Sequence, residues 1–173
     1  MLLGIHDDSI VLLVFLRIIQ AIASGNGPLA SNWRQLLLKL YKRGIGYRAA
    51  CLSDKDFLNW VELSHSASAE AYNLTADARK ALTMGLATYP QSAPLWRIWL
   101  EDRIRTHAQD TAERPEAVVE KDFRQAVRAV GVRQAEAGVL FQIYLDFLLT
   151  SNDGSAQDEA RTHKDFAKAL TQV

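Results

Sequence analysis

Apolar residues along this chain recur at intervals of three and four positions, which is the spacing of one face of an α-helix. Phe141, Tyr144, Leu145 and Leu148 show this spacing near the C-terminus. The sequence contains no sustained alternation of apolar and polar residues, which would be typical of a half-buried strand. The pattern therefore predicts an all-α protein of about eight helices, near 8–24, 31–45, 54–66, 69–88, 93–108, 115–130, 137–150 and 156–172.

Residues of the kind that start and stop helices stand at the expected boundaries. Ser53 predicts an N-cap for the helix over 54–66, and Asp56 follows three residues later to complement it. Proline is tolerated in the first turn of a helix and disrupts its interior. All four prolines fall where helices are expected to begin or end: Pro28, Pro90, Pro94 and Pro115.

A first pattern repeats along the chain, in which a large residue precedes a small residue by three positions. The large and small residues are Tyr41 and Gly44, Leu82 and Gly85, Phe123 and Ala126, and Phe166 and Ala169. The small residues are 41, 41 and 43 positions apart. Glycine in mid-helix costs about 1 kcal/mol relative to alanine, whereas burying a large aromatic side chain contributes about 1.5–3 kcal/mol. We therefore expect the small residue to be a notch for close helix packing.

A second pattern interleaves with the first and consists of two aromatic residues three positions apart, followed by an aliphatic and an acidic residue. The aromatic pairs are Phe57 and Trp60, Trp96 and Trp99, and Phe141 and Tyr144. Two interleaved patterns with a period near 40 residues predict an α-solenoid of antiparallel helix pairs. We expect one domain over 1–173, with helix pairs near 8–45, 54–88, 93–130 and 137–172.

These patterns resemble the HAT (half-a-TPR) repeat, in which one helix carries the aromatic pair and its partner carries Ala-Arg, a large residue and a small residue. A proline stands at the turn between them. The resemblance covers about residues 37–170 and implies a TPR-like right-handed superhelix. In the copy that contains Phe123, Gly131 stands in place of the turn proline. The best match is carried by Ala78, Arg79, Leu82, Gly85 and Pro90, followed by Trp96, Trp99 and Glu101.

HAT repeats occur mainly in RNA-processing assemblies. The segments Phe123–Val127 and Leu140–Phe147, with a closing helix after them, resemble the branch of the family that belongs to the U-three small nucleolar ribonucleoprotein. The resemblance implies the C-terminal part of a longer solenoid, located in the nucleolus of the nucleus. There it would be a non-enzymatic scaffold for small-subunit ribosomal RNA processing and contact other protein subunits. The alternatives are a HAT scaffold of pre-mRNA splicing or 3′-end cleavage and, more remotely, a small helical enzyme.

The charge balance adds a candidate contact surface. Lys and Arg together number 20, as do Asp and Glu, so the formal net charge is zero and a wholly basic nucleic-acid binder is excluded. Residues 1–50, however, carry six basic side chains and two acidic ones. The basic residues from 34 to 48 are candidates for contact with an acidic partner surface or with RNA phosphates, or form the polar face of an amphipathic helix. They are Arg34, Lys39, Lys42, Arg43 and Arg48.

The sequence contains no residue pattern typical of a catalytic or metal site. The four histidines are scattered, without the spacing of metal ligands. Cys51 is the single cysteine, so an internal disulfide is excluded. Glu101 and Asp102 are expected on a solvated, ion-paired helix face, since adjacent residues on a helix do not face each other. We expect no catalytic residue, metal, cofactor or small-molecule substrate.

The first predicted helix is the most apolar part of the chain. Its apolar stretch over 10–23 is interrupted by Arg17 and Gln20 and is shorter than the roughly 20 residues of a membrane span, so no membrane is expected. The end of a solenoid needs a polar outer face. We therefore expect a partner or further repeats to cover this helix.

Overall fold

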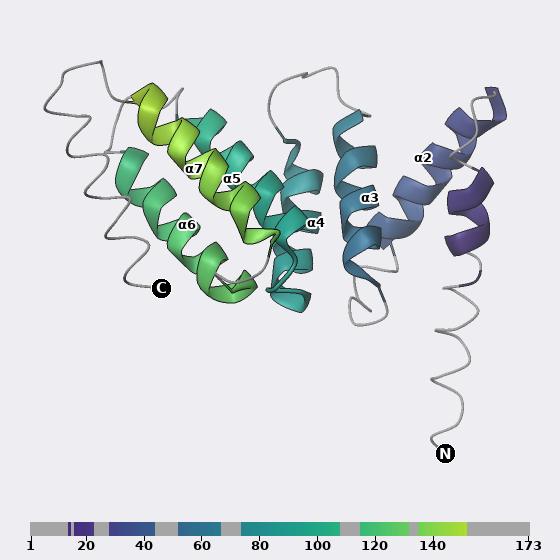
Figure 1. Ribbon diagram of the computed structural model, residues 1–173. Coiled ribbons are helices and arrows are strands. Elements are labelled where there is room, and N and C mark those ends of the chain that lie inside the picture. Colours follow the sequence, from purple (N-terminus) through teal and green to yellow (C-terminus); the bar gives the residue numbers. More distant parts are fainter. Residues whose placement is uncertain are drawn as a thin grey trace, which may run out of the picture. The chain divides into compact units, whose positions relative to one another are not determined.

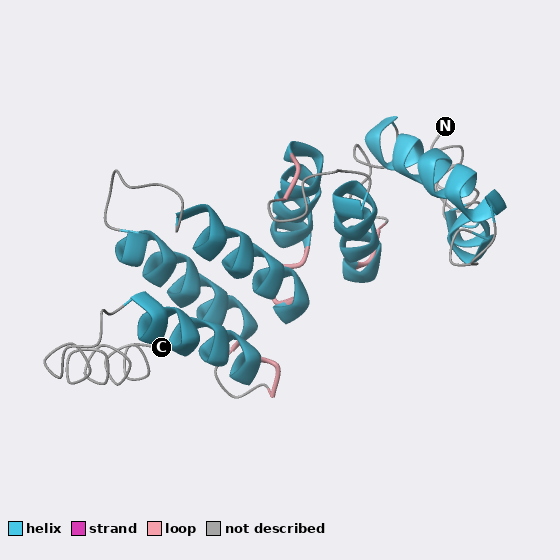
Figure 2. Cartoon of the chain, turned by 90° about the horizontal axis from the view of Figure 1, so that it is seen from above, coloured by secondary structure: helices cyan, strands magenta, loops and turns pink. Residues whose placement is uncertain are grey.

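The computed structural model describes residues 14, 16–22, 28–43, 52–66, 74–107, 115–131 and 135–151. Across these ranges every regular element is a helix and no residue is in a strand, as Figure 2 shows. Most packing contacts join helices that follow one another along the chain. The prediction of an all-α protein is therefore confirmed.

The chain divides into two compact units, Met1–Thr88 and Tyr89–Val173. The N-terminal unit contains the helical residues 16–22 and the helices α2 (Pro28–Arg43), α3 (Asp54–Ser66) and α4 (Ala76–Thr88), which are labelled in Figure 1. Helix α3 packs against both α2 and α4. The core side chains include Leu16, Ile19, Leu37, Tyr41, Phe57, Trp60, Ala78 and Leu82, all at most 2% exposed.

The C-terminal unit contains α5 (Ala93–His107), α6 (Pro115–Val130) and α7 (Ala137–Ser151). Each of these three helices packs against the other two. They therefore enclose one apolar core, to which every helix contributes. Its largest fully buried side chains are Leu95, Leu100, Val119, Phe123, Val127 and Leu140.

Local capping explains where several helices begin and end. The Asp56 amide donates to Ser53 Oγ over 3.4 Å and the Ser53 amide donates to Asp56 Oδ2 over 2.8 Å, so the expected cap of α3 is present. Helix α6 begins at Pro115 as expected. It ends before Gly131, whose φ of 90° suits glycine and whose amide donates to the Val127 carbonyl over 2.8 Å.

Two predicted helix starts differ from the structure. The helix expected over 69–88 begins only at Ala76, because Thr75 caps it: the Ala78 amide donates to Thr75 Oγ1 over 3.2 Å. The helix expected over 31–45 begins earlier, at Pro28, and is described to Arg43. The ranges 54–66 and 115–130 agree with the structure. The predicted helix over 156–172 lies outside the described residues.

Candidate functional site

The most polar contact inside the N-terminal unit surrounds the carboxylate of Asp56, which is fully buried at the start of α3. Arg17 from the 16–22 helix donates to both carboxylate oxygens, with Nη1 2.5 Å from Oδ1 and Nη2 2.9 Å from Oδ2. Gln20 Nε2 donates to Oδ1 over 2.9 Å, and the Ser53 hydroxyl donates to Oδ2 over 2.7 Å. We call these four residues the Asp56 latch, because they join the first helix to α3.

The latch sets the charge state of Asp56. Burial alone raises the pKa of a carboxylate, but hydrogen bonds from Gln20, Ser53 and Arg17 favour the charged form and outweigh burial, so the pKa of Asp56 lies below 3.8. The carboxylate is therefore ionised at neutral pH. Sequence reasoning identifies the Ser53–Asp56 cap but misses Arg17, whose only sequence signal is that it interrupts an apolar run.

Beside the latch, Tyr41 and Trp60 stack face to face. Their ring centroids are 5.3 Å apart and their planes differ by 7°. Gln20 Nε2 also donates to the Tyr41 hydroxyl over 2.9 Å, so this residue of the Asp56 latch is hydrogen-bonded to the ring stack. Burial raises the pKa of the Tyr41 phenol well above its ordinary value, and this group remains protonated. Phe57 adds a third ring, 6.4 Å from Trp60.

The C-terminal unit contains a second stack of the same kind. The rings of Phe123 and Tyr144 are 4.2 Å apart and differ by 8° in orientation, and Phe141 meets Phe123 edge-on at 5.2 Å. Tyr41 and Phe123 are the large residues of the first sequence pattern. Trp60 and Tyr144 are the second aromatic residues of the second pattern. Equivalent positions of the two patterns are therefore in contact in both units.

The tryptophans of α5 also lie at packing positions. Trp96 is 5% exposed, and its Nε1 donates to the Pro90 carbonyl over 2.6 Å. Trp99 is half-buried and donates to Asp122 Oδ2 on α6 over 3.1 Å. The Arg103 guanidinium lies 4.7 Å from the centre of the Trp99 ring and donates to the same Asp122 oxygen over 3.1 Å. Trp99 and Arg103 thus join α5 to α6.

The small residues proposed as notches are buried where they are described. Gly85 lies among the buried residues of α4 together with Leu82. Ala126 is fully buried in α6. Gly44, Phe166 and Ala169 lie outside the described residues.

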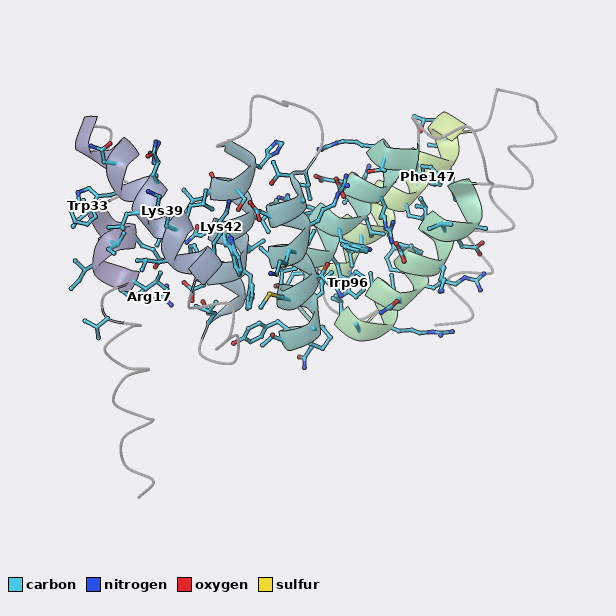
Figure 3. All side chains as sticks on the ribbon, turned by 180° about the vertical axis from the view of Figure 1, so that it is seen from behind. Arg17, Trp33, Lys39, Lys42, Trp96 and Phe147 are labelled. Atoms are coloured by element: carbon cyan, nitrogen blue, oxygen red, sulfur yellow. The ribbon has the colours of Figure 1, made fainter. Side chains whose placement is uncertain are left out.

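The basic candidates lie mainly on exposed positions of α2. Arg34, Lys39 and Lys42 are exposed, and Lys42 forms an ion pair with Asp77 of α4 at 2.5 Å, with both side chains about half exposed. Figure 3 labels Lys39 and Lys42 on this helix. Arg43 is helical but its side chain is outside the description, and Arg48 lies outside the described residues. An exposed pair contributes little to stability, so these side chains remain suited to meeting a partner.

The first helix exposes aliphatic side chains on the side away from its buried residues. Val14 and Ile18 are each 53% exposed and Ile22 is 41% exposed, whereas Leu16 and Ile19 are 1% exposed. Val14, Ile18 and Ile22 are four residues apart and form one line along the helix, which we call the aliphatic stripe. The exposed apolar face expected on this helix therefore lies along Val14, Ile18 and Ile22.

A second surface feature lies along α6, where an open groove of about 730 Å³ is found. Arg124 and Glu120 form an ion pair within it. Because its cations are accompanied by this carboxylate, the groove is less cationic than its basic residues alone suggest. Its described lining consists of Ala117, Glu120, Lys121, Arg124, Gln125, Arg128 and Ala129.

The expectation of a solvated pair at Glu101 and Asp102 is wrong for Asp102, which is 4% exposed. Successive residues on a helix point in different directions, so one of the two can face the core while the other faces solvent. Glu101 does meet the expectation: its carboxylate lies 4.0 Å from Arg97 and 3.5 Å from Arg105.

Within the described ranges, no group of three or more His, Cys, Asp or Glu residues is arranged to hold a metal ion. Of the helices in the same ranges, none has the length and apolar character needed to cross a membrane. Cys51 lies outside the described residues. Comparison with protein-family models, with curated proteins and with solved structures found no match for this chain.

Proposed function

We propose that this chain is a HAT-type scaffold, part of a longer α-solenoid in a nucleolar ribonucleoprotein that supports early processing of small-subunit ribosomal RNA. The scaffold acts by shape and charge complementarity with neighbouring protein subunits. RNA contact, where it occurs, is secondary to these protein contacts. The proposal rests on the repeated sequence patterns and on the resemblance to HAT repeats.

The observation that carries the proposal is the repeated ring stack. Tyr41 on Trp60 and Phe123 on Tyr144 pair the same two pattern positions with nearly parallel planes, 7° and 8° apart. A repeat protein packs equivalent residues in equivalent ways because each repeat meets its neighbour through the same interface. Chance similarity of short helical motifs gives no reason for the same contact to recur, so the stack favours a repeated structural unit.

The distribution of polar groups supports a scaffold more than an enzyme. The best-formed polar cluster, the Asp56 latch, has its carboxylate fully covered and every oxygen engaged by donors from the same chain. A general acid or base needs access to a substrate proton. The latch therefore serves to join helices, and the exposed aliphatic and basic side chains are the groups available to partners.

The test is crosslinking mass spectrometry on the complex purified from cells through the full chain, with sequencing of the RNA that copurifies. The expected result is crosslinks from this chain to protein subunits of a ribosome-biogenesis particle, together with precursor RNA of the small subunit. Spliceosomal RNA or messenger 3′-end fragments in its place would assign the scaffold to another machine and overturn the nucleolar proposal. A purified chain without protein crosslinks would overturn the scaffold role.

A further inference from the structure

We infer that the open groove along α6 is a binding site for the phosphate backbone of single-stranded RNA, which is held by Lys121, Arg124 and Arg128. We call this surface, with the lining given above, the α6 groove. The inference deepens the proposed function and rests on it for the presence of RNA in the complex. It adds where RNA is contacted and which chemistry holds it.

The three cations lie on one face of α6, the helix labelled in Figure 1. Lys121, Arg124 and Arg128 are separated by three and four positions, which is the spacing of neighbouring side chains on a helix surface. All three line the same groove. With a rise of about 1.5 Å per residue, they extend over about 10 Å along the helix axis. Phosphates of one duplex strand follow each other every 3.4 Å or so along the axis, so a row of this length can meet several phosphates at once.

The other sides of α6 are occupied by contacts within the C-terminal unit. Phe123 and Ala126 are fully buried in its core. The carboxylate of Asp122 accepts hydrogen bonds from Trp99 and Arg103 of α5. Asp122 is therefore engaged by another helix and does not neutralise the cations of the α6 groove.

One carboxylate accompanies the three cations of the groove. Glu120 forms an ion pair with Arg124, one helical turn away. Lys121 and Arg128 are exposed, and neither forms an ion pair in the part of the chain that the structure describes. Gln125 also lines the groove, and its side-chain amide can donate hydrogen bonds. The described lining thus has two unpaired positive charges, which favour an anionic occupant.

The rest of the lining favours a phosphate backbone over an acidic protein. The centre of a protein interface is formed mainly by apolar and aromatic side chains. The apolar residues of the described lining are Ala117 and Ala129, whose single methyl groups offer little apolar contact. Phosphate oxygens are bound by arginine, lysine and side-chain amides, and the groove provides this set. Proteins that bind single strands without sequence preference likewise use a positively charged groove that follows the backbone.

The same lining determines the expected mode of binding. Among the described residues of the groove there is no aromatic side chain on which a base could stack. Contacts to phosphate carry no sequence information. Binding should therefore depend strongly on salt and should not distinguish one base from another.

The experiment measures binding of a fluorescently labelled oligouridine of about 12 nucleotides to the full chain by fluorescence anisotropy. The comparison probes are an oligocytidine of the same length and an oligoglutamate peptide of the same charge. We expect the two RNAs to bind alike and the peptide to bind much more weakly. Between about 50 and 200 mM salt, the logarithm of the association constant should fall linearly with the logarithm of the salt concentration, with a slope of about −2 for three phosphate contacts.

Two variants with a matched control locate the site. Lys121→Gln and Arg128→Gln each remove one unpaired cation from an exposed position. Each should weaken binding severalfold and make the salt dependence shallower by about 0.7, the contribution of one phosphate contact to a single strand. Arg97→Gln removes the same charge from a side chain of α5 that is 53% exposed, and should change neither the affinity nor the slope. Circular dichroism establishes that each variant keeps its helix content.

Equal weakening by Arg128→Gln and Arg97→Gln would overturn the inference, because the net charge of the chain would then control binding. An unchanged salt slope in Lys121→Gln and Arg128→Gln would overturn it as well, as would the absence of oligouridine binding to the native chain. Preferential binding of oligoglutamate would also overturn it, and would identify an acidic protein segment as the occupant.

The α6 groove and the nucleolar assignment fail separately. Oligouridine can bind through Lys121 and Arg128 while the complex purified from cells contains RNA of another machine, which overturns only the nucleolar assignment. The complex can contain precursor RNA of the small subunit while both substitutions leave the affinity unchanged, which overturns only the α6 groove.

Discussion

The two units of this chain use the same ring stack in different surroundings. Around Tyr41 and Trp60 the neighbours are one further ring, Phe57, and a polar group, because Gln20 connects the tyrosine hydroxyl to the carboxylate of Asp56. Around Phe123 and Tyr144 the neighbours are two further rings. Phe141 meets Phe123 edge-on, and the ring centroid of Phe147 lies 6.4 Å from that of Tyr144. The same ring contact is thus supported by a hydrogen-bonded charge in one unit and by aromatic packing in the other.

The difference predicts different responses to the same perturbation. Aromatic packing depends on filled volume and is insensitive to pH. A buried carboxylate depends on its partners and on its ionisation. Substitutions in the two units should therefore separate these two modes of support.

Phe123→Ala should cause the largest loss, about 3–5 kcal/mol in the free energy of unfolding of the C-terminal unit, because a fully buried aromatic ring leaves a cavity against Tyr144 and Phe141. Chemical denaturation followed by circular dichroism measures it. Leu149→Ala is the control, because this exposed side chain should change stability by less than about 0.5 kcal/mol. Similar losses for the two variants would show that the stack does not organise the core.

Asp56→Ala should cost about 2–3 kcal/mol in the N-terminal unit. It removes the reciprocal half of the capping box, in which the Ser53 amide and hydroxyl donate to Asp56 Oδ2, and it removes the buried partner of Arg17. The contribution of the ion pair is smaller than for two buried charges, because the Arg17 side chain is 47% exposed and becomes hydrated once it is released. Hydrogen exchange should show faster exchange at residues 16–22.

The matched control is Asp54→Ala in the same first helical turn. Asp54 is only half-buried, and its carboxylate accepts a hydrogen bond from the Lys55 amide over 2.9 Å. Asp54→Ala should therefore lower the free energy of unfolding by no more than about 0.5 kcal/mol, the usual range for a surface substitution. Equal losses of stability for the two substitutions would mean that Asp56 acts only as an acidic residue at a helix N-terminus, and that its contacts with Arg17 and Gln20 add nothing.

The pH dependence of the N-terminal unit should follow from the same residue. The pKa of Asp56 is lower in the folded chain than the value near 4 of an unfolded aspartate. The ionised carboxylate therefore stabilises the fold fully above that pH, and this contribution is lost as the pH falls through the lowered pKa. The measurement is the free energy of unfolding of the native chain and of Asp56→Asn from pH 7 downward.

We expect the native chain to be the more stable at pH 7, and the difference between the two to narrow below about pH 4, where an unfolded aspartate takes up its proton. A difference that stays constant or widens on acidification would contradict the assigned role of Asp56. The stack between Phe123 and Tyr144 has no carboxylate in it, so Phe123→Ala should cost the same at both ends of this range.

Features that depend on residues close together in the sequence could be predicted. The Ser53–Asp56 cap spans three positions, and proline positions alone mark the start of α6. The ring partners could not be predicted, because the patterns identify the small residues as the packing notches and do not pair Tyr41 with Trp60 or Phe123 with Tyr144. The start of α4 could not be, because the Thr75 cap competes with a helical pattern that continues before it.

Long-range polar contacts could not be predicted. Arg17 and Asp56 are 39 positions apart, and the position of this arginine within an apolar run does not identify its partner. Likewise Asp102 is buried although its neighbour Glu101 is exposed enough to form surface ion pairs. Which side of a helix faces the core is decided by the neighbouring helices, and charge alone does not reveal it.

Tyr41→Phe should have the smallest effect, at most about 1 kcal/mol, the contribution of one neutral hydrogen bond. The ring stack on Trp60 is kept, and Gln20 loses one acceptor but still donates to Asp56 Oδ1 over 2.9 Å. Phe123 already lacks the hydroxyl at the equivalent position, so the stack itself does not need it. Thermal denaturation of the native chain and of Tyr41→Phe measures the difference. A loss comparable to that of Asp56→Ala would mean that the hydroxyl is an essential part of the Asp56 latch, and that the polar support of the N-terminal unit extends into the stack.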